Sequence, residues 1–287
     1  MMTTDKPGLL DPQIVTFKDA MSTLVIDLAN TCNDIGLATA AWGTATAETV
    51  NKTHRHGVSN AARLPDEVSR AVIQVAGGDL HLIGQLLTYS FTAPTLVGPL
   101  ARSAVENAAL ILTLNRETDS PEVRTYRAAR ALRDGIKNDE THNAHPGVDK
   151  LRKELTQLTT RYTNKHTVEE NKEFGEGTRA LVREELGELV GNDLYDELCN
   201  VTHYNAWTAF FQHLVADVKP IVMELDSLRY AYRTGLAVVG SGFVLLRYRD
   251  EQATTGIREQ LNTYTTRLLQ LGNAVDAYQD ELRKQTS

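Results

Sequence analysis

The chain has 287 residues, of which 41% are hydrophobic and 23% are charged, a composition that is typical of a globular protein and excludes a disordered or fibrous one. Its net charge is −7 and its pI is about 5.6, so broad electrostatic adhesion to nucleic acid or to an anionic membrane is not expected. The longest uncharged apolar run, 235–246, is too short to span a membrane.

Two features favour a cytoplasmic location. The only cysteines, Cys32 and Cys199, both lie in apolar, helix-like segments, so reduced thiols are expected in place of a disulfide framework. The N-terminal residues show no basic region followed by an apolar run, so no signal peptide is expected.

Apolar residues recur at helical spacing along most of the chain, and no alternating β pattern of any length occurs. This pattern predicts an all-α, multi-helix bundle of roughly seven to nine helices with no significant β-sheet. We expect a flexible tail over 1–12 and a single helical domain over 13–287, with looser segments near 42–62 and 167–178. The expected helices are 14–41, 65–91, one that begins near Pro94 and Pro99 and runs to 114, 121–137, 148–166, 178–189, 194–214, 220–249 and 255–284.

Local signals refine several of these helices. Ser120, Pro121 and Glu122 form a helix start, with an N-cap, a proline at the first position and an acidic first turn. Gly77 and Gly78 are expected to bend or interrupt the helix over 65–91. The helix that ends at 114 is apolar around much of its circumference, so we predict that it is the most buried.

Two short patterns place polar groups on one helix face each. The first is Arg102 and Glu106, four residues apart among Ala, Val, Leu and Ile, so these charges are expected to be largely enclosed. The second is Tyr195, Cys199 and His203, again four residues apart, with Asn200 on a neighbouring stripe. Enclosed charges need partners, so the two patterns predict that the two helices meet.

The role of these groups has two interpretations. In the structural one, Arg102, Glu106, Tyr195 and His203 fix helix packing. In the catalytic one, His203 is a general acid or base because its pKa lies near neutral pH, and Arg102 and Glu106 complete the site. Tyr195 and Asn200 are then candidate binding residues.

Other kinds of site find little support. No Gly-rich phosphate loop, catalytic serine elbow or zinc-type spacing occurs, and the pairs His54/His56 and His142/His145 lack further helix-borne ligands, so neither a metal nor a cofactor is expected. Arg124, Arg127 and Arg130 follow each other at intervals of three residues. They form either a solvated helix face or a local patch for RNA.

The segments that contain Asp79 to His81, Arg102 to Glu106, the arginines of 124–133 and Tyr195 to His203 resemble a group of uncharacterised all-helical actinobacterial and actinophage proteins. That group is in turn similar to HEPN-type helical domains, some of which are metal-independent ribonucleases of toxin or abortive-infection systems. Their nuclease pattern has an arginine a few residues before the histidine. The residues that precede His203, including Glu197 and Leu198, contain no such arginine.

Two functions follow as expectations. The first is a helical protein that acts by homo-oligomerisation or by binding a protein partner, in a phage or host-defence setting that the resemblance implies. The alternative is a HEPN-like ribonuclease or toxin-class effector that uses His203 and Arg102.

Overall fold

The computed structural model describes residues 11–38, 61–89, 94–138, 146–164, 178–202, 220–247 and 251–285. Within these ranges the structure has nine α-helices, one short 3-10 helix and no strand, which confirms the predicted all-α fold. The elements are α1 (Pro12–Leu37), η1 (Ala61–Arg63), α3 (Leu64–Leu87), α4 (Pro94–Leu114), α5 (Pro121–Asn138), α6 (Pro146–Thr163), α8 (Thr178–Val190), α9 (Leu194–Thr202), α11 (Pro220–Leu246) and α12 (Glu251–Gln285).

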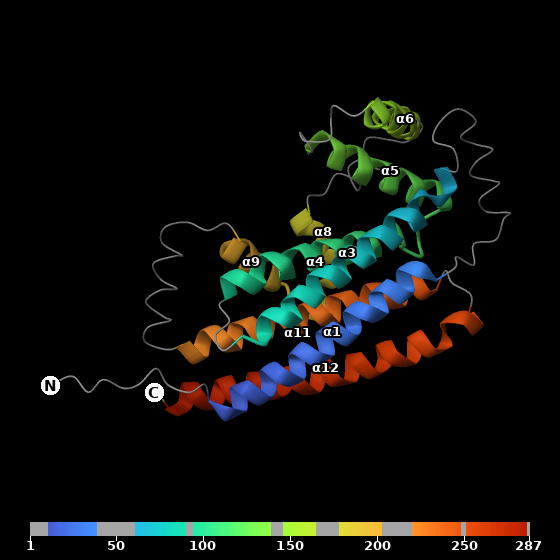
Figure 1. Ribbon diagram of the computed structural model, residues 1–287. Helices are drawn as coiled ribbons and strands as arrows, with labels where there is room; N and C mark the ends of the chain where they lie inside the picture. Colours follow the sequence, from blue (N-terminus) through green and yellow to red (C-terminus); the bar gives the residue numbers. More distant parts are fainter. Residues whose placement is uncertain are drawn as a thin grey trace.

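Five long helices run side by side and form the main bundle (Figure 1). In this bundle α1 packs on α3, α3 on α4, α4 on α11 and α11 on α12. The short helices α8 and α9 lie against α4, while α5 and α6 form a pair on one side of the bundle, over the start of α3 and the end of α4 (Figure 1). None of the described helices is long and apolar enough to cross a membrane.

The start of α1 is fixed by Asp11, which lies inside the range that the sequence assigned to the tail. The Asp11 side chain accepts a hydrogen bond from the backbone N–H of Gln13 at 2.8 Å, and Pro12 occupies the first helical position. Asp11 also accepts a hydrogen bond of 2.7 Å from the hydroxyl of Tyr278 on α12. The two ends of the described chain are therefore joined.

The expected bend at Gly77 and Gly78 is wrong, because α3 is continuous through both residues. A Cβ on Gly77 would lie 2.8 Å from Cβ of Cys32 and 3.1 Å from the carbonyl oxygen of Ala29, both on α1. Gly77 is therefore the point at which two helix backbones come close together. A Cβ on Gly78 would have none of the surrounding atoms within 4 Å, so that residue faces open space.

Helix α4 contacts α3, α5, α8, α9 and α11. It begins at Pro94 and continues through Pro99. At Gly98 a Cβ would lie 2.6 Å from Cγ1 of Val201, so this glycine lets α9 pack closely on α4. The prediction that α4 is the most buried helix is wrong, because a larger share of the residues of α11 is buried.

The buried side chains form two clusters. The larger one runs through the main bundle and includes residues of α1, α3, α4, α8, α9, α11 and α12. The smaller one joins η1 and the ends of α3 and α4 to α5 and α6, with Leu64, Leu114, Ala128 and Leu155 among its members. The α5/α6 pair is thus attached through its own small core.

Candidate functional site

Helix α9 carries one half of the predicted site, and its start is fixed by a turn that α11 braces. Gly191 ends α8 with a φ of 89°, which is the left-handed region that favours glycine. The guanidinium of Arg233, on α11, donates hydrogen bonds of 2.5 Å to the carbonyl oxygen of Val190 and to Oδ1 of Asp193. One buried arginine therefore holds the end of α8 and the start of α9 together.

The predicted meeting of the two helices is confirmed. Tyr195, on α9, donates a hydrogen bond of 2.7 Å from its hydroxyl to Oε1 of Glu106, on α4. The same oxygen accepts a hydrogen bond of 2.8 Å from Nε of Arg102, and Nη2 of Arg102 lies 3.5 Å from the Tyr195 hydroxyl. The guanidinium carbon of Arg102 is also 5.6 Å from the centre of the Tyr195 ring. Glu106 is thus the shared acceptor of a three-residue cluster.

The cluster is less enclosed than the sequence predicted. The side chains of Arg102 and Glu106 are 21% and 31% exposed, whereas Tyr195 is buried. Burial, followed by the hydrogen bond to Glu106, raises the pKa of Tyr195 above its usual value of 10.0. The tyrosine therefore keeps its proton and remains a donor at neutral pH.

The rest of the pattern predicted on α9 does not extend this cluster within the described part of the chain. His203 lies outside the described residues, so its expected convergence with Arg102 and Glu106 stays a prediction. Cys199 is half-buried, and Asn200 is exposed. The meeting of α4 and α9 is therefore established without the histidine on which the catalytic interpretation depends.

Sequence reasoning missed a second polar contact of α9. Asp196 accepts hydrogen bonds of 2.6 Å from Arg179 and from Arg183, both on α8. The hydrogen bond from Arg179, followed by that from Arg183, lowers the pKa of Asp196 despite the opposing effect of desolvation. Together with Tyr195 and Asp193, Asp196 makes α9 a short helix that polar contacts hold to α4, α8 and α11.

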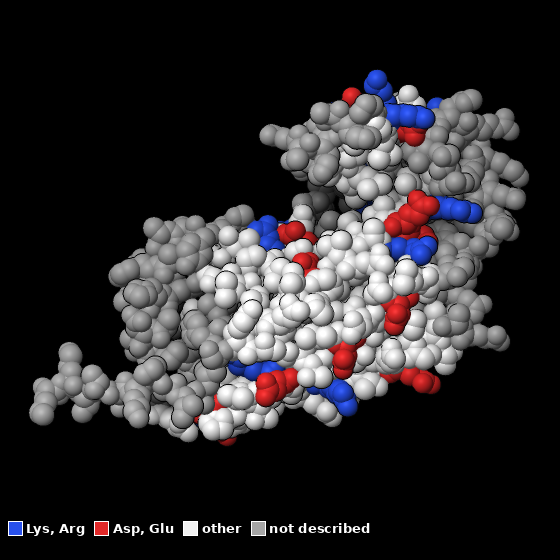
Figure 2. Space-filling view, in the orientation of Figure 1, with Lys and Arg blue, Asp and Glu red and all other residues white. Residues whose placement is uncertain are grey.

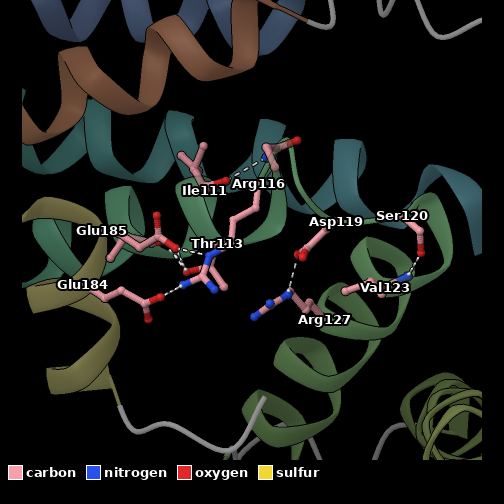
Figure 3. Close-up of polar contacts among 11 residues, drawn as sticks. Ile111, Thr113, Arg116, Asp119, Ser120, Val123, Arg127, Glu184 and Glu185 are labelled. Atoms are coloured by element: carbon pink, nitrogen blue, oxygen red, sulfur yellow. Dashed lines mark hydrogen bonds and ion pairs between the residues drawn. The ribbon is translucent and has the colours of Figure 1, made fainter. Parts of the chain in front are cut away.

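Most arginines of α5 form ion pairs with carboxylates of the same chain. Arg127 is buried and its Nε lies 2.8 Å from Oδ2 of Asp119, as Figure 3 shows. Nε of Arg130 lies 3.5 Å from Oδ2 of Asp134. Arg124 also has an interaction partner. Figure 1 shows α5 well separated from α9, so the predicted RNA-binding arginines and the Arg102 cluster do not form one site.

A small polar pocket lies where α4 ends against α8 and α11. It has a volume of about 320 Å³ and is lined in part by Arg116, Glu184, Glu185 and Arg247. Arg116 pairs with both Glu184 and Glu185 (Figure 3), and Arg247 pairs with Glu117 at 2.6 Å. Both arginines are thus paired with carboxylates, and within the described part of the chain no group of three or more His, Cys, Asp and Glu could hold a metal ion.

A shallow groove of about 770 Å³ lies on the surface between α1 and α12. Its lining combines small side chains such as Ala20, Thr23 and Ala274 with the charged Asp19 and Arg267. These two charged side chains are exposed. The groove is therefore open to solvent along the two helices and is not an enclosed ligand site.

The most distinctive surface of the described chain is a charge-poor face on α3 and the start of α4. Four of the eight large hydrophobic side chains that are exposed among the described residues lie here: Val75 (54% exposed), Leu82 (47%), Tyr89 (61%) and Leu96 (50%). Figure 2 shows a broad area without charged side chains in the middle of this side of the molecule, with charged ones around it. We call the surface formed by Ala71, Val75, Gly78, Leu82, Tyr89 and Leu96 the charge-poor face.

Comparisons with protein-family models, with curated proteins and with solved structures found no match to this chain. The resemblance to the actinobacterial and actinophage proteins therefore rests on its short sequence motifs alone.

Proposed function

We propose that this chain is a non-catalytic helical binding protein that acts by associating with another protein chain through the charge-poor face. The observation that carries the proposal is a stripe of exposed apolar residues spaced seven apart: Val75 and Leu82 on the solvent side of α3, and Tyr89 just beyond the end of this helix. A seven-residue repeat of exposed apolar residues is typical of a helix that packs against another helix.

The charge distribution supports the same function. Between residues 71 and 114 the charged residues are only Asp79, Arg102 and Glu106, although charged residues make up 23% of the whole chain. Solvated helix faces of soluble proteins normally carry charges, and exposed apolar patches on them mark interaction sites. The exposed side of α3 thus has the composition of an interface.

The polar cluster supports a structural role for the predicted site. The Glu106 carboxylate accepts hydrogen bonds from both Arg102 and Tyr195, so it is occupied by groups of the protein itself. Such a cluster fixes the contact between α4 and α9. In this function α9 supports the bundle. We propose that the protein acts in the cytoplasm, in the phage or host-defence setting that the resemblance implies.

Two measurements on the purified protein test the proposal. Sedimentation velocity over a wide range of protein concentration is expected to show an oligomer that dissociates on dilution. Incubation with total RNA is expected to leave the RNA intact. RNA cleavage that is lost in Arg102→Ala and His203→Ala, while both variants keep the wild-type melting temperature, would instead establish the ribonuclease alternative.

A further inference from the structure

We infer that the occupant of the charge-poor face is a second copy of this chain, whose own α3 packs antiparallel against α3 so that Gly78 faces Leu82 of the partner subunit. The inference rests on the proposed function and adds the identity of the partner and the register of the contact. It follows from the sizes of the residues along the stripe, from charge and from area.

Large and small residues alternate along the exposed side of α3 in a way that suits antiparallel pairing. The small residues Ala71 and Gly78 alternate with the larger Val75 and Leu82, and the polar Gln85 follows on the same exposed side before Tyr89. In an antiparallel pair whose two-fold axis passes near residue 80, two residues face each other when their numbers add up to 160. Tyr89 then covers Ala71 of the partner subunit, Leu82 covers Gly78, and Val75 meets Gln85.

Gly78 is the centre of this arrangement. Apart from the backbone of α3 itself, no surrounding atom lies within 4 Å of the position where its Cβ would stand, so the surface is open there. In the antiparallel register the Leu82 side chain of the partner subunit fills this opening, and the same contact repeats across the two-fold axis. A parallel pair would place Gly78 against Gly78 and Tyr89 against Tyr89, which leaves one gap and one clash.

The low charge of this face is compatible with a second copy as its partner. Each chain carries a net charge of −7, and two copies that meet through this face bring no like charges into direct contact at the interface. Asp79 is the only charged residue of α3 beyond Arg70; burial raises the pKa of its carboxyl group, and Ser103 of α4 acts on that pKa in the opposite direction. The carboxylate is therefore turned toward α4 and away from the stripe.

The area of the face is sufficient for a dimer of modest affinity. From Ala71 to Leu87 the helix is about 24 Å long, and α3 with its neighbour α4 is about 20 Å wide. The projected area is then about 500 Å², close to the ~600 Å² per partner at the lower end of specific interfaces. The dimer is expected to depend on concentration.

The first experiment measures the dissociation constant of the wild-type dimer and of Leu82→Lys by sedimentation equilibrium. The substitution places two lysines at the centre of the interface and is expected to weaken the dimer by about 30-fold or more. Leu269→Lys is the matched control, because Leu269 on α12 is 46% exposed and Leu82 is 47% exposed. It is expected to leave the dimer unchanged, and both variants are expected to keep the wild-type melting temperature of the monomer.

The second experiment tests the register by disulfide cross-linking in a Cys199→Ser background. Cys32 does not interfere, because it is buried and burial raises the pKa of its thiol to about 12. Ala71→Cys and Tyr89→Cys proteins are prepared separately, mixed and oxidised. The mixture is expected to form a cross-linked dimer, whereas neither protein alone is expected to do so.

Each alternative result overturns a defined part of the proposal. Cross-linking of Tyr89→Cys with itself shows a parallel pair and overturns the register, while association through the charge-poor face stands. A dimer that persists in Leu82→Lys shows that another surface joins the copies, and it overturns the inference, while association of this face with a different protein chain stands. A wild-type chain that stays monomeric at every concentration overturns the second copy as partner.

Discussion

At the scale of single residues, the Arg102, Glu106 and Tyr195 cluster shows how a polar contact fixes two helices. Glu106 accepts hydrogen bonds from both other residues. Tyr195→Phe removes one of these bonds and keeps the ring, so the free energy of unfolding is expected to fall by about 1 kcal/mol. Urea denaturation at a protein concentration low enough for the monomer to predominate measures this loss, and Tyr89→Phe, which changes an exposed tyrosine, is the control. A loss in the Tyr195 variant no larger than in the control would contradict a structural role.

Two aspartates near α11 are expected to respond to pH in opposite directions. Burial raises the pKa of Asp226, only partly offset by Arg229. Burial also acts on Asp193, but there the hydrogen bond and charge of Arg233 prevail and lower its pKa. The ordinary pKa of both groups is 3.8.

The sign of each effect follows from proton binding. For Asp226 the folded state holds its proton longer, so stability decreases as the pH rises from 3.8 through the raised pKa. Asp226→Asn is therefore expected to gain stability relative to the wild type over that interval. Asp193→Asn is expected to be less stable than the wild type at neutral pH, and this difference is expected to vanish as the pH falls from 3.8 through the lowered pKa. Chemical denaturation at several pH values measures the stability of both variants relative to the wild type. If this relative stability changed with pH in the same way for both variants, the opposite pKa shifts of Asp226 and Asp193 would be contradicted.

At the scale of helices, close approach decides where glycine is required. A Cβ on Gly77 would lie 2.8 Å from Cβ of Cys32, whereas none of the surrounding atoms lies within 4 Å of such a position on Gly78. Gly77→Ala is therefore expected to lower the free energy of unfolding by about 1–3 kcal/mol through overpacking. Gly78→Ala is expected to raise it by up to about 1 kcal/mol, because alanine is the better helix former.

The two glycine variants are compared by thermal melting at a protein concentration low enough for the monomer to predominate. Since the residues are neighbours on one helix, any difference between the variants reports the contact with α1 and not helix propensity. Equal melting temperatures would show that α1 and α3 are not packed closely at this point.

At the scale of the whole molecule, a buried ion pair joins residues that are far apart in the chain. Nζ of Lys18, on α1, lies 2.7 Å from Oε2 of Glu224, on α11, and the two side chains are 3% and 0% exposed. Lys18 also donates a hydrogen bond of 2.7 Å to the carbonyl oxygen of Tyr89, just beyond the end of α3. One ammonium group therefore holds three segments of the bundle together.

Removal of one partner of this pair leaves a buried charge without its counter-ion. Lys18→Met is expected to reduce the free energy of unfolding by about 3–5 kcal/mol. The double variant Lys18→Met/Glu224→Gln is expected to recover part of this loss, because no buried carboxylate remains. Chemical denaturation of the single and double variants forms a double-mutant cycle, and additive losses would contradict a coupled pair.

The helical class and most helix starts followed from the sequence, because apolar spacing, proline and N-cap signals act within a few residues. The ends were less accurate: the first helix was expected to reach residue 41 but ends at Leu37. Gly77 was misjudged for a related reason, since its role depends on Cys32 and Ala29 of another helix. Helix propensity is a local property, whereas close approach is not.

The sequence by itself determined that Arg102 and Glu106 share one helix face, that Tyr195 lies on another helix, and that such charges need partners. Only the tertiary structure decided that all three meet at one carboxylate oxygen, and that Lys18 and Glu224 pair across 206 positions. It also decided that the apolar repeat of Val75, Leu82 and Tyr89 faces solvent. The physical reason is that a periodic pattern defines the faces of each helix, but which face is buried depends on the helices that pack around it.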